Sequence, residues 1–209
     1  MTYAVKEIFL TVQGEGGQAG RPAVFCRFAG CNLWSGLERD RASAVCNFCD
    51  TEFVGTDGPG GGKFKTAEAL AMAVAEKWPG GGKPLVVCTG GEPLLQLDDP
   101  LIAAFKAQGF DIAVETNGTI AAPAGIDWLT VSPKANAELA QLSGDELKLV
   151  FPQPEHDPAQ FEHLKFKRFS LQPMDGPRQM ENATKAFEYC LAHPKWSLSL
   201  QTHKWIGAP

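Results

Sequence analysis

The chain has 209 residues, of which 44% are hydrophobic and 21% are charged, and its formal net charge is −5. A chain of this length can bury one sizeable core but is short for two independent domains, so we expect a single domain over residues 1–209. The acidic balance and the absence of clustered Lys and Arg argue against a nucleic-acid surface as the main partner.

The N-terminal segment does not have the composition of a targeting signal. Met1–Leu10 carries Glu7 and lacks a basic stretch followed by an apolar one, and the sequence contains no uncharged apolar run of about eighteen residues. We therefore expect a cytoplasmic protein that does not contact a membrane. In that reducing compartment the six cysteines are better explained as metal ligands or reactive thiols than as disulfides.

Short apolar runs predict a series of strands that alternate with helical patterns. The predicted strands are Ala23–Phe28, Leu85–Cys88, Asp111–Glu115, Trp128–Val131, Leu147–Phe151, Phe169–Leu171 and Leu198–Leu200. Such apolar strands are typical of a parallel sheet that is covered on both faces. Before them, Val5, Ile8 and Leu10 predict an additional edge strand or turn.

Helical spacing and stop signals predict three helices between these strands. One begins after Thr66 and places Leu70, Val74 and Trp78 on one stripe, a second spans Asp99–Gln108 before Gly109, and a third spans Arg178–His193 before Pro194. Because a closed eight-unit barrel needs about 250 residues, we expect an α/β fold with about six βα units in an incomplete, splayed parallel barrel. A doubly wound open sheet is the alternative. The glycine-rich stretches Gly55–Gly62 and Pro79–Gly82 are expected to be flexible connections.

Polar residues follow the predicted strands at the points where they end. The segments are Thr89–Pro93, Glu115–Gly118, Ser132–Lys134, Gln172–Asp175 and Gln201–Lys204, and Cys31 follows the first strand in the same way. Carboxyl ends of parallel strands share one rim, where ligands bind in barrels and open sheets alike. Although any one polar turn is unremarkable, this repetition predicts a single site.

The cysteine pattern indicates a metal centre. Cys46 and Cys49 form a CxxC pair, and Cys31 lies upstream with Asn32–Val45 between them. Thiolates suit iron–sulfur clusters or zinc. Adding Cys26 gives nearly the spacing of a four-cysteine zinc site, although Cys26 and Cys88 fall inside strands and are better explained as buried core residues.

Three cysteines on a four-iron cluster would leave one iron free to bind a cofactor. Near the second predicted strand end, Gly90 and Gly91 would let the backbone approach such a ligand, and Glu92 could accept an ammonium group.

These motifs together resemble the radical S-adenosylmethionine (SAM) superfamily. Its cluster cysteines follow the first barrel strand, usually as CxxxCxxC, and a Gly-Gly-Glu motif ends the second, as in Thr89-Gly90-Gly91-Glu92-Pro93. The long spacer after Cys31, together with Gln13-Gly14-Glu15-Gly16, resembles one branch of the superfamily, the ring-contracting lyases of 7-deazapurine and queuosine biosynthesis.

The resemblance implies a reaction and its cofactors. A [4Fe–4S] cluster, reduced by an external donor such as flavodoxin, would cleave SAM and so start the conversion of 6-carboxy-5,6,7,8-tetrahydropterin to 7-carboxy-7-deazaguanine with loss of ammonia. Mg²⁺ and a homodimer are also implied. In such enzymes the protein mainly positions the reactants and excludes water.

The resemblance also assigns roles to individual residues. Cys31, Cys46 and Cys49 would be the catalytic cluster ligands, and Thr51 would bind Mg²⁺. SAM would contact Phe48, Cys49, Asp50, Gly91, Glu92, Asn117, Ser132, Pro133, Lys134, Gln172, Pro173, Met174 and Asp175. The pterin would contact Val12, Gln13, Gly14, Glu15, Arg27, Thr89, Gly90, His203 and Pro209.

Two other functions fit parts of the pattern. An activating enzyme that makes a glycyl radical on a protein partner has a similar short barrel, but Gln13–Gly16 and Thr51 favour the small-molecule substrate. A zinc-stabilised binding module would instead use Cys26 together with the other three cysteines.

Overall fold

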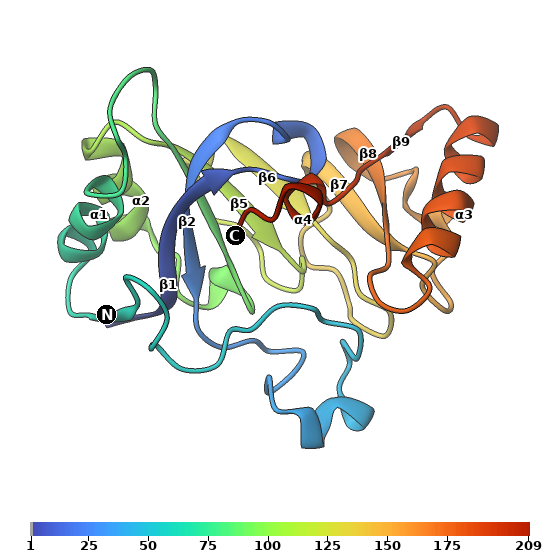
Figure 1. Cartoon of the computed structure of the whole chain (residues 1–209), viewed down its shortest axis with the longest axis horizontal. Coiled ribbons are helices and arrows are strands. Elements are labelled where there is room, and N and C mark those ends of the chain that lie inside the picture. Colours follow the sequence, from blue (N-terminus) through green and yellow to red (C-terminus); the bar gives the residue numbers. More distant parts are fainter. Residues whose placement is uncertain (1) are drawn as a thin grey trace.

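The computed structural model describes residues 2–209, which form one curved sheet with helices packed against it (Figure 1). The nine strands are β1 (Tyr3–Val12), β2 (Pro22–Phe28), β3 (Gly62–Phe64), β4 (Leu85–Gly90), β5 (Asp111–Thr116), β6 (Trp128–Val131), β7 (Ser143–Phe151), β8 (Lys165–Pro173) and β9 (Trp196–Leu198). Their order in the sheet is β3-β1-β2-β4-β5-β6-β7-β8-β9. Within residues 2–209 the sheet thus runs from an edge at β3 to an edge at β9 and stays open.

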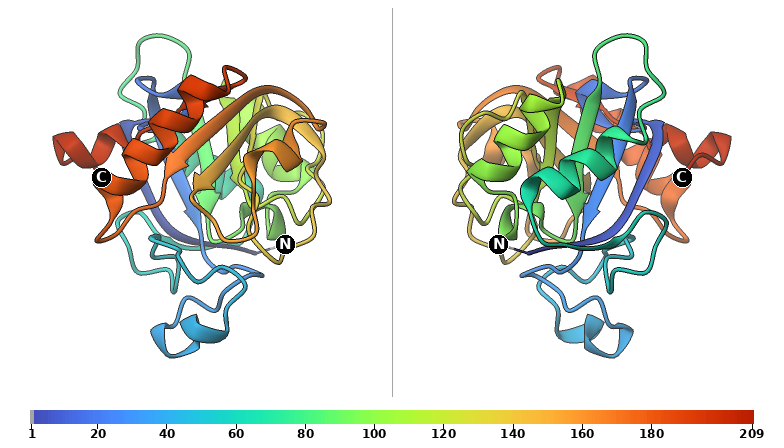
Figure 2. Two further views of the ribbon diagram at one scale, coloured as in Figure 1. Left: turned by 90° about the vertical axis from the view of Figure 1, so that its right-hand side faces the viewer. Right: turned by 90° about the vertical axis from the view of Figure 1, so that its left-hand side faces the viewer.

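Helices cover the convex side of the sheet near its two ends (Figure 2). The α-helices are α1 (Ala67–Ala75), α2 (Asp99–Ala107), α3 (Gln179–Ala192) and α4 (Thr202–Ile206), and the 3₁₀ helices are η1 (Gly16–Gln18), η2 (Glu38–Ser43), η3 (Pro93–Leu95) and η4 (Pro158–Phe161). Helices α1 and α2 pack on each other, and α3 packs on β8 and β9. None of the helices in the described part of the chain is long and apolar enough to cross a membrane.

Side-chain caps fix where the first two long helices begin. The Thr66 hydroxyl accepts a hydrogen bond from the Ala69 amide at 3.2 Å, and the Asp98 carboxylate accepts one from Leu101 at 3.1 Å. Gly109, with φ of +82°, follows α2 in the left-handed conformation that ends many helices. The three predicted helices are therefore present, although α1 ends before Trp78.

The parallel α/β fold expected from the sequence is confirmed. β2 and β4 to β9 form six neighbouring parallel pairs, and β1 lies antiparallel to β2 and β3. The predicted strands are all present, the last one shifted to Trp196–Leu198. Only the connections that contain α1, α2 and α3 use α-helices, and the other three parallel connections are loops or 3₁₀ turns. These short connections explain how 209 residues accommodate so many crossovers.

The expectation that Gly55–Gly62 is a flexible connection is wrong. The Gly58 amide donates to the Lys6 carbonyl at 3.0 Å, and Pro59 accepts from the Ile8 amide at 2.8 Å, so the segment runs along β1. A Cβ on Gly61 would lie 2.1 Å from the Lys6 carbonyl oxygen. The glycines are there because the segment packs directly on another backbone.

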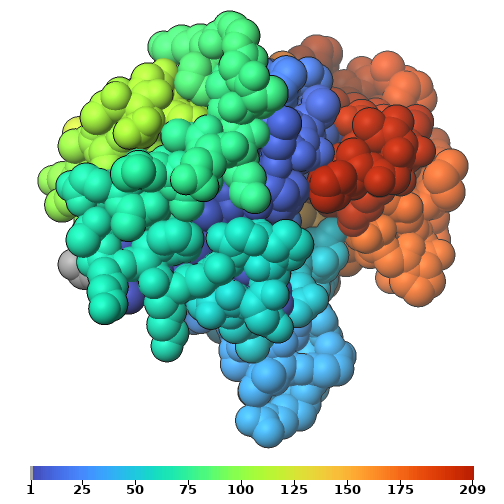
Figure 3. All heavy atoms as spheres, turned by 60° about the vertical axis from the view of Figure 1, so that its left-hand side comes forward, coloured from blue at the N-terminus to red at the C-terminus, as the bar shows by residue number. Residues whose placement is uncertain are grey.

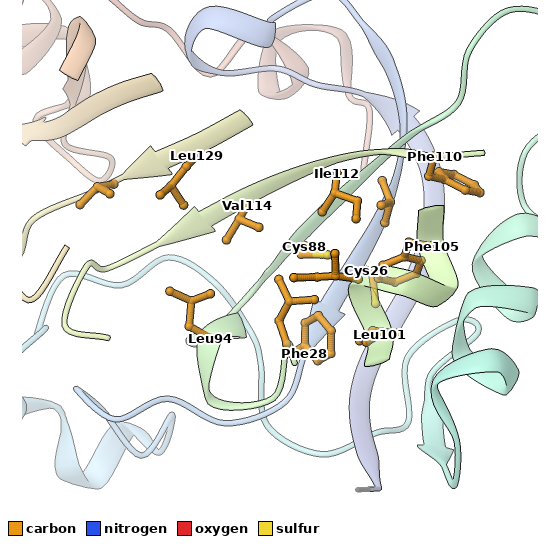
Figure 4. Packing of buried hydrophobic residues seen from close by; sticks show 14 of the residues in the cluster. Cys26, Phe28, Cys88, Leu94, Leu101, Phe105, Phe110, Ile112, Val114 and Leu129 are labelled. Carbon is orange, nitrogen blue, oxygen red and sulfur yellow. The ribbon is translucent and has the colours of Figure 1, made fainter. Parts of the chain in front are cut away.

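Alternation along the strands separates an apolar convex face from a more polar concave face. Val24, Cys26 and Phe28 of β2 belong to the main core, whereas the intervening Phe25 and Arg27 face the other way and line a cavity. Figure 4 shows Cys26 and Cys88 within this core, among Phe28, Leu101 and Ile112. Both cysteines are fully buried, in agreement with the sequence prediction.

Candidate functional site

A cavity lies where the parallel strands end, as the polar strand ends predicted. Most of the residues assigned to the site from the sequence line it together. They are Val12, Gln13, Gly14, Glu15, Arg27, Cys46, Phe48, Cys49, Asp50, Thr51, Thr89, Gly90, Gly91, Asn117, Ser132, Lys134, Gln172, Pro173, Met174, Asp175, His203 and Pro209. Sheet curvature and parallel strand order thus bring together segments that lie almost 200 residues apart in the chain.

Three of the assigned residues do not line this cavity. Cys31 lines a neighbouring depression together with the segment that follows it. Glu92 is fully buried behind the cavity wall, and the Pro133 carbonyl accepts a hydrogen bond from Gln153 Nε2 at 3.3 Å.

Cys31, Cys46 and Cys49 are free thiols at this end of the sheet. The neighbouring Cys46 thiol holds the pKa of Cys49 below its usual range, and burial raises the pKa of Cys31. The Leu33 amide lies 3.4 Å from the Cys31 sulfur and donates to it. Soft sulfur donors at neighbouring positions with an adjoining cavity fit an iron–sulfur cluster that has one open iron.

The four-cysteine zinc site does not fit this geometry. Cys26 lies in the core beside Cys88, on the convex side of β2, whereas Cys46 and Cys49 line the cavity. Within residues 2–209, no three His, Cys, Asp or Glu side chains are grouped closely enough to hold a single metal ion.

The glycine pair at the end of β4 is required by the chain itself. A Cβ on Gly90 would lie 2.2 Å from the Phe28 carbonyl oxygen, and one on Gly91 would lie 2.1 Å from the Gly30 oxygen and 2.7 Å from the Cys31 Cβ. No side chain fits at either position. The two glycines therefore let the end of β4 pack directly on the loop that carries Cys31.

Glu92 connects the ends of β4 and β5. Its carboxylate accepts hydrogen bonds from the Leu94 amide at 3.0 Å, the Thr116 hydroxyl at 2.8 Å and the Asn117 amide at 2.8 Å. Burial raises the pKa of Glu92, while these hydrogen bonds favour the ionised form. Through these hydrogen bonds Glu92 holds the ends of β4 and β5 together and fixes the backbone at Asn117.

Lys134 brings a positive charge to the cysteine side of the cavity. Its ammonium donates to the Ser132 carbonyl at 2.7 Å and to the Ser132 hydroxyl at 2.6 Å. Burial lowers the pKa of Lys134, and attraction to the neighbouring sulfurs of Cys46 and Cys49 opposes that shift. A buried ammonium beside the cysteines is suited to holding an anionic ligand group next to them.

A buried charged group in the cavity was missed by the sequence analysis. The Lys148 ammonium lies 2.5 Å from a Glu15 oxygen and 2.8 Å from a Glu115 oxygen. Gln13 Nε2 donates to the other Glu115 oxygen at 3.3 Å. The sequence does contain one signal for this network. Lys148 is a charged residue within the apolar end of β7, and a lysine at such a position is rarely buried without a partner of opposite charge.

An aromatic wall on β1 and β2 was also missed. Phe9 and Phe25 stack with ring centroids 5.4 Å apart, and the Arg27 guanidinium carbon lies 5.7 Å from the Phe9 ring centroid. Arg27 Nε donates to Glu7 at 2.7 Å. All three cavity-lining side chains come from one face of the β1–β2 pair, which gives the cavity a flat apolar side next to a guanidinium.

The C-terminal segment closes one side of the cavity. Gln201 donates to Glu15 at 2.9 Å, and the Lys204 ammonium bridges Asp50 at 2.8 Å and Asp175 at 2.6 Å. A Cβ on Gly14 would collide with the His203 ring at 2.1 Å, so glycine is what admits the imidazole there. In Figure 1 this segment, including α4, lies beside the N-terminal loop at the mouth of the sheet.

Comparison with known proteins identifies relatives over the whole chain. Residues 41–146 match the model of the radical SAM superfamily. The chain is 68% identical to 7-carboxy-7-deazaguanine synthase from Caulobacter vibrioides and 60% identical to that from Burkholderia multivorans, over 100% of both chains in each case. It also resembles the crystal structure of QueE from Escherichia coli, with 26% identity, a TM-score of 0.69, and coverage of 96% of this chain and 94% of the other.

Proposed function

The chain belongs to the 7-carboxy-7-deazaguanine synthase family of radical SAM enzymes, and from that premise we propose that the cavity described above is its active site. The protein is a radical SAM lyase that converts 6-carboxy-5,6,7,8-tetrahydropterin to 7-carboxy-7-deazaguanine with loss of ammonia, in queuosine biosynthesis. One observation supports the site most directly. Cys46 and Cys49 line the same cavity as the buried Lys148 and its partners Glu15 and Glu115.

Cys31, Cys46 and Cys49 are the proposed ligands of a [4Fe–4S] cluster. Their thiols are free, and they lie at the strand ends next to a cavity. When bound, such a cluster supplies the electron that cleaves SAM. Of the proposed SAM contacts, Asp50, Asp175 and Lys134 provide charged groups for the amino and carboxylate ends of the methionine moiety.

The pterin is proposed to lie toward the β1–β2 side of the cavity. The Phe9–Phe25 wall offers a flat apolar surface for a planar ring. Arg27 lines the cavity and uses Nε for Glu7, so its other N–H groups can donate to a ligand carboxylate. Carboxylates such as Glu15 can accept hydrogen bonds from the amino group and ring N–H of the pterin.

Mg²⁺ is proposed at Thr51. The Thr51 hydroxyl lies 3.5 Å from an Asp50 oxygen, and both residues line the cavity. Hydroxyl and carboxylate oxygens suit this hard cation, which also keeps several water ligands and can contact the carboxylate of the substrate.

The cellular setting is part of the same proposal. We propose that the whole chain works as one domain, since its nine strands join one sheet. Six free thiols suit a reducing cytoplasm, and a flavodoxin is the proposed electron donor. The proposed homodimer could use apolar residues that α3 exposes, among them Met180, Phe187 and Leu191.

The function is tested by supplying the anaerobically reconstituted protein with SAM, a reductant and 6-carboxy-5,6,7,8-tetrahydropterin. Formation of 7-carboxy-7-deazaguanine, detected by mass spectrometry together with 5′-deoxyadenosine, is the expected result. Release of 5′-deoxyadenosine without any deazapurine would contradict the substrate assignment. A colourless protein with one zinc per chain would contradict radical chemistry altogether.

A further inference from the structure

The spacer between Cys31 and Cys46 forms a projection that is tied back to the cysteine loop. Figure 3 shows it in light blue, projecting from the body of the molecule. It contains η2 (Glu38–Ser43), and the Cys46 amide donates to the Leu33 carbonyl at 3.3 Å where the spacer returns. Because this long spacer makes few backbone contacts of its own, side chains are needed to keep Cys31 and the Cys46–Cys49 loop in fixed relative positions.

Trp34 anchors the base of the spacer. Its side chain is buried, packs edge-to-face on Phe53 with ring centroids 5.6 Å apart, and donates from Nε1 to the Leu37 carbonyl at 3.3 Å. A tryptophan so placed is part of the packing and is not a surface for a partner.

Arg41 connects this anchor to the CxxC loop. Its guanidinium carbon lies 4.2 Å from the centroid of the Trp34 ring, and Nη1 donates to the Asn47 carbonyl at 3.2 Å and to the Cys49 carbonyl at 3.1 Å. Nε donates to Glu38 at 2.7 Å, which fixes the plane of the guanidinium. One side chain thus joins η2, the tryptophan and two peptide groups within Cys46–Cys49.

From these contacts we propose that Arg41 is a positioning residue for the cluster, which holds the Cys46–Cys49 loop in the conformation that presents both thiols. The inference rests on the cluster ligands proposed above. The guanidinium is suited to the task because its planar fork can stack on an aromatic ring and donate in-plane at the same time. Lysine carries the same charge but lacks the planar guanidinium group, so it cannot stack on the ring and donate in the same plane.

The first test measures amide hydrogen exchange in a peptide spanning residues 44–51 of the full-length chain, with and without the cluster. Arg41→Gln and Arg41→Lys should both exchange about tenfold faster than the unsubstituted protein, the scale expected for losing one charge-assisted hydrogen bond. Arg39→Gln is the matched control, because Arg39 lies on the same 3₁₀ helix, is 79% exposed, and pairs only distantly with Asp40 at 3.7 Å. Arg41 variants that exchange no faster than Arg39→Gln would overturn the proposal.

The second test follows the cluster itself. After anaerobic reconstitution and a timed exposure to air, Arg41→Gln and Arg41→Lys should retain several-fold less iron and sulfide than Arg39→Gln, and the electron paramagnetic resonance spectrum of the reduced cluster should broaden. Unchanged retention and an unchanged spectrum would also overturn the role. A full cluster in Cys31→Ala would instead contradict the proposed cluster ligands. Hydrogen exchange on the cluster-free chain tests the role of Arg41 independently, so a failure of that role can be told apart from a failure of the ligand assignment.

Discussion

The carboxylate of Glu115 on β5 lies 2.8 Å from the ammonium of Lys148 on β7, although β6 separates the two strands in the sheet. The contact forms because the concave face curves enough for long side chains to meet across the intervening strand. Lys148 is 5% exposed and also contacts Glu15 from the N-terminal loop. The centre of the cavity is therefore a buried network in which two carboxylates share one cation.

Lys148→Met should destabilise the protein strongly. It would leave the largely enclosed carboxylates of Glu15 and Glu115 without their cation, and removing one partner of a buried pair costs roughly 3–5 kcal/mol. The shift is measured as a lower urea midpoint at pH 7. Lys167→Met is the matched control, since Lys167 is 80% exposed in its pair with Asp145 and its loss should change the midpoint little. Equal midpoints for the two variants would contradict the importance of the buried network.

Glu15 should make stability depend on pH in the acid range. Burial alone would raise its pKa, but attraction and a hydrogen bond from Lys148 outweigh burial and lower the pKa from 4.5 to about 2. A carboxyl with a depressed folded-state pKa stabilises the fold above its unfolded pKa, and that contribution is lost as pH falls through the folded pKa. The stability advantage of the unsubstituted chain over Glu15→Gln should therefore shrink by up to about 3 kcal/mol between pH 5 and pH 2.

The measurement is urea unfolding of the cluster-free chain at several pH values, because acid destroys iron–sulfur clusters. A difference between the two proteins that stays constant across this range would show that Glu15 is not held in its ionised form.

Cys31→Ala should abolish cluster assembly, whereas Cys26→Ala should leave it largely intact. Cys26 is fully buried in the apolar core, so its substitution removes packing worth about 1 kcal/mol and no proposed ligand. Iron and sulfide per chain after anaerobic reconstitution measure the outcome. The reverse pattern would restore the four-cysteine zinc interpretation.

Gly91→Ala should disturb the cluster loop without touching a cysteine. The added Cβ would meet the Gly30 carbonyl oxygen at 2.1 Å and the Cys31 Cβ at 2.7 Å, so the loop must move, at a cost of roughly 1–3 kcal/mol. Iron content and the thermal midpoint should both fall. Gly62→Ala is the control, because its Cβ would meet only the Phe64 ring at 3.8 Å, an ordinary contact. A fully loaded, equally stable Gly91→Ala protein would contradict the tight packing seen there.

Thr51→Ala should weaken the response of product formation to Mg²⁺. Removing the hydroxyl takes away one oxygen from the proposed site, so a higher Mg²⁺ concentration should be needed for half-maximal stimulation. Thr184→Ala provides the comparison, since its exposed hydroxyl bonds only within α3. If the magnesium titrations of the two variants superimpose, the role proposed for Thr51 is withdrawn.

The sequence by itself determined most of the strands, though not β3 (Gly62–Phe64), and where the functional ends of the parallel strands fall. Apolar runs and turn residues are local signals, so Leu85–Cys88 and Asp111–Glu115 could be placed without any knowledge of their neighbours. Parallel strand order then sends all carboxyl ends to one rim, and most of the residues assigned to the site accordingly line one cavity.

Only the tertiary structure decided which of those residues contact one another. Lys148 meets Glu15 across 133 positions of the chain, and Arg41 reaches the Cys49 carbonyl from the spacer between Cys31 and Cys46. Such contacts depend on the register of the strands, the curvature of the sheet and the path of a non-repetitive loop. None of these is encoded in a local pattern, because each is set by packing between segments that are distant in the sequence.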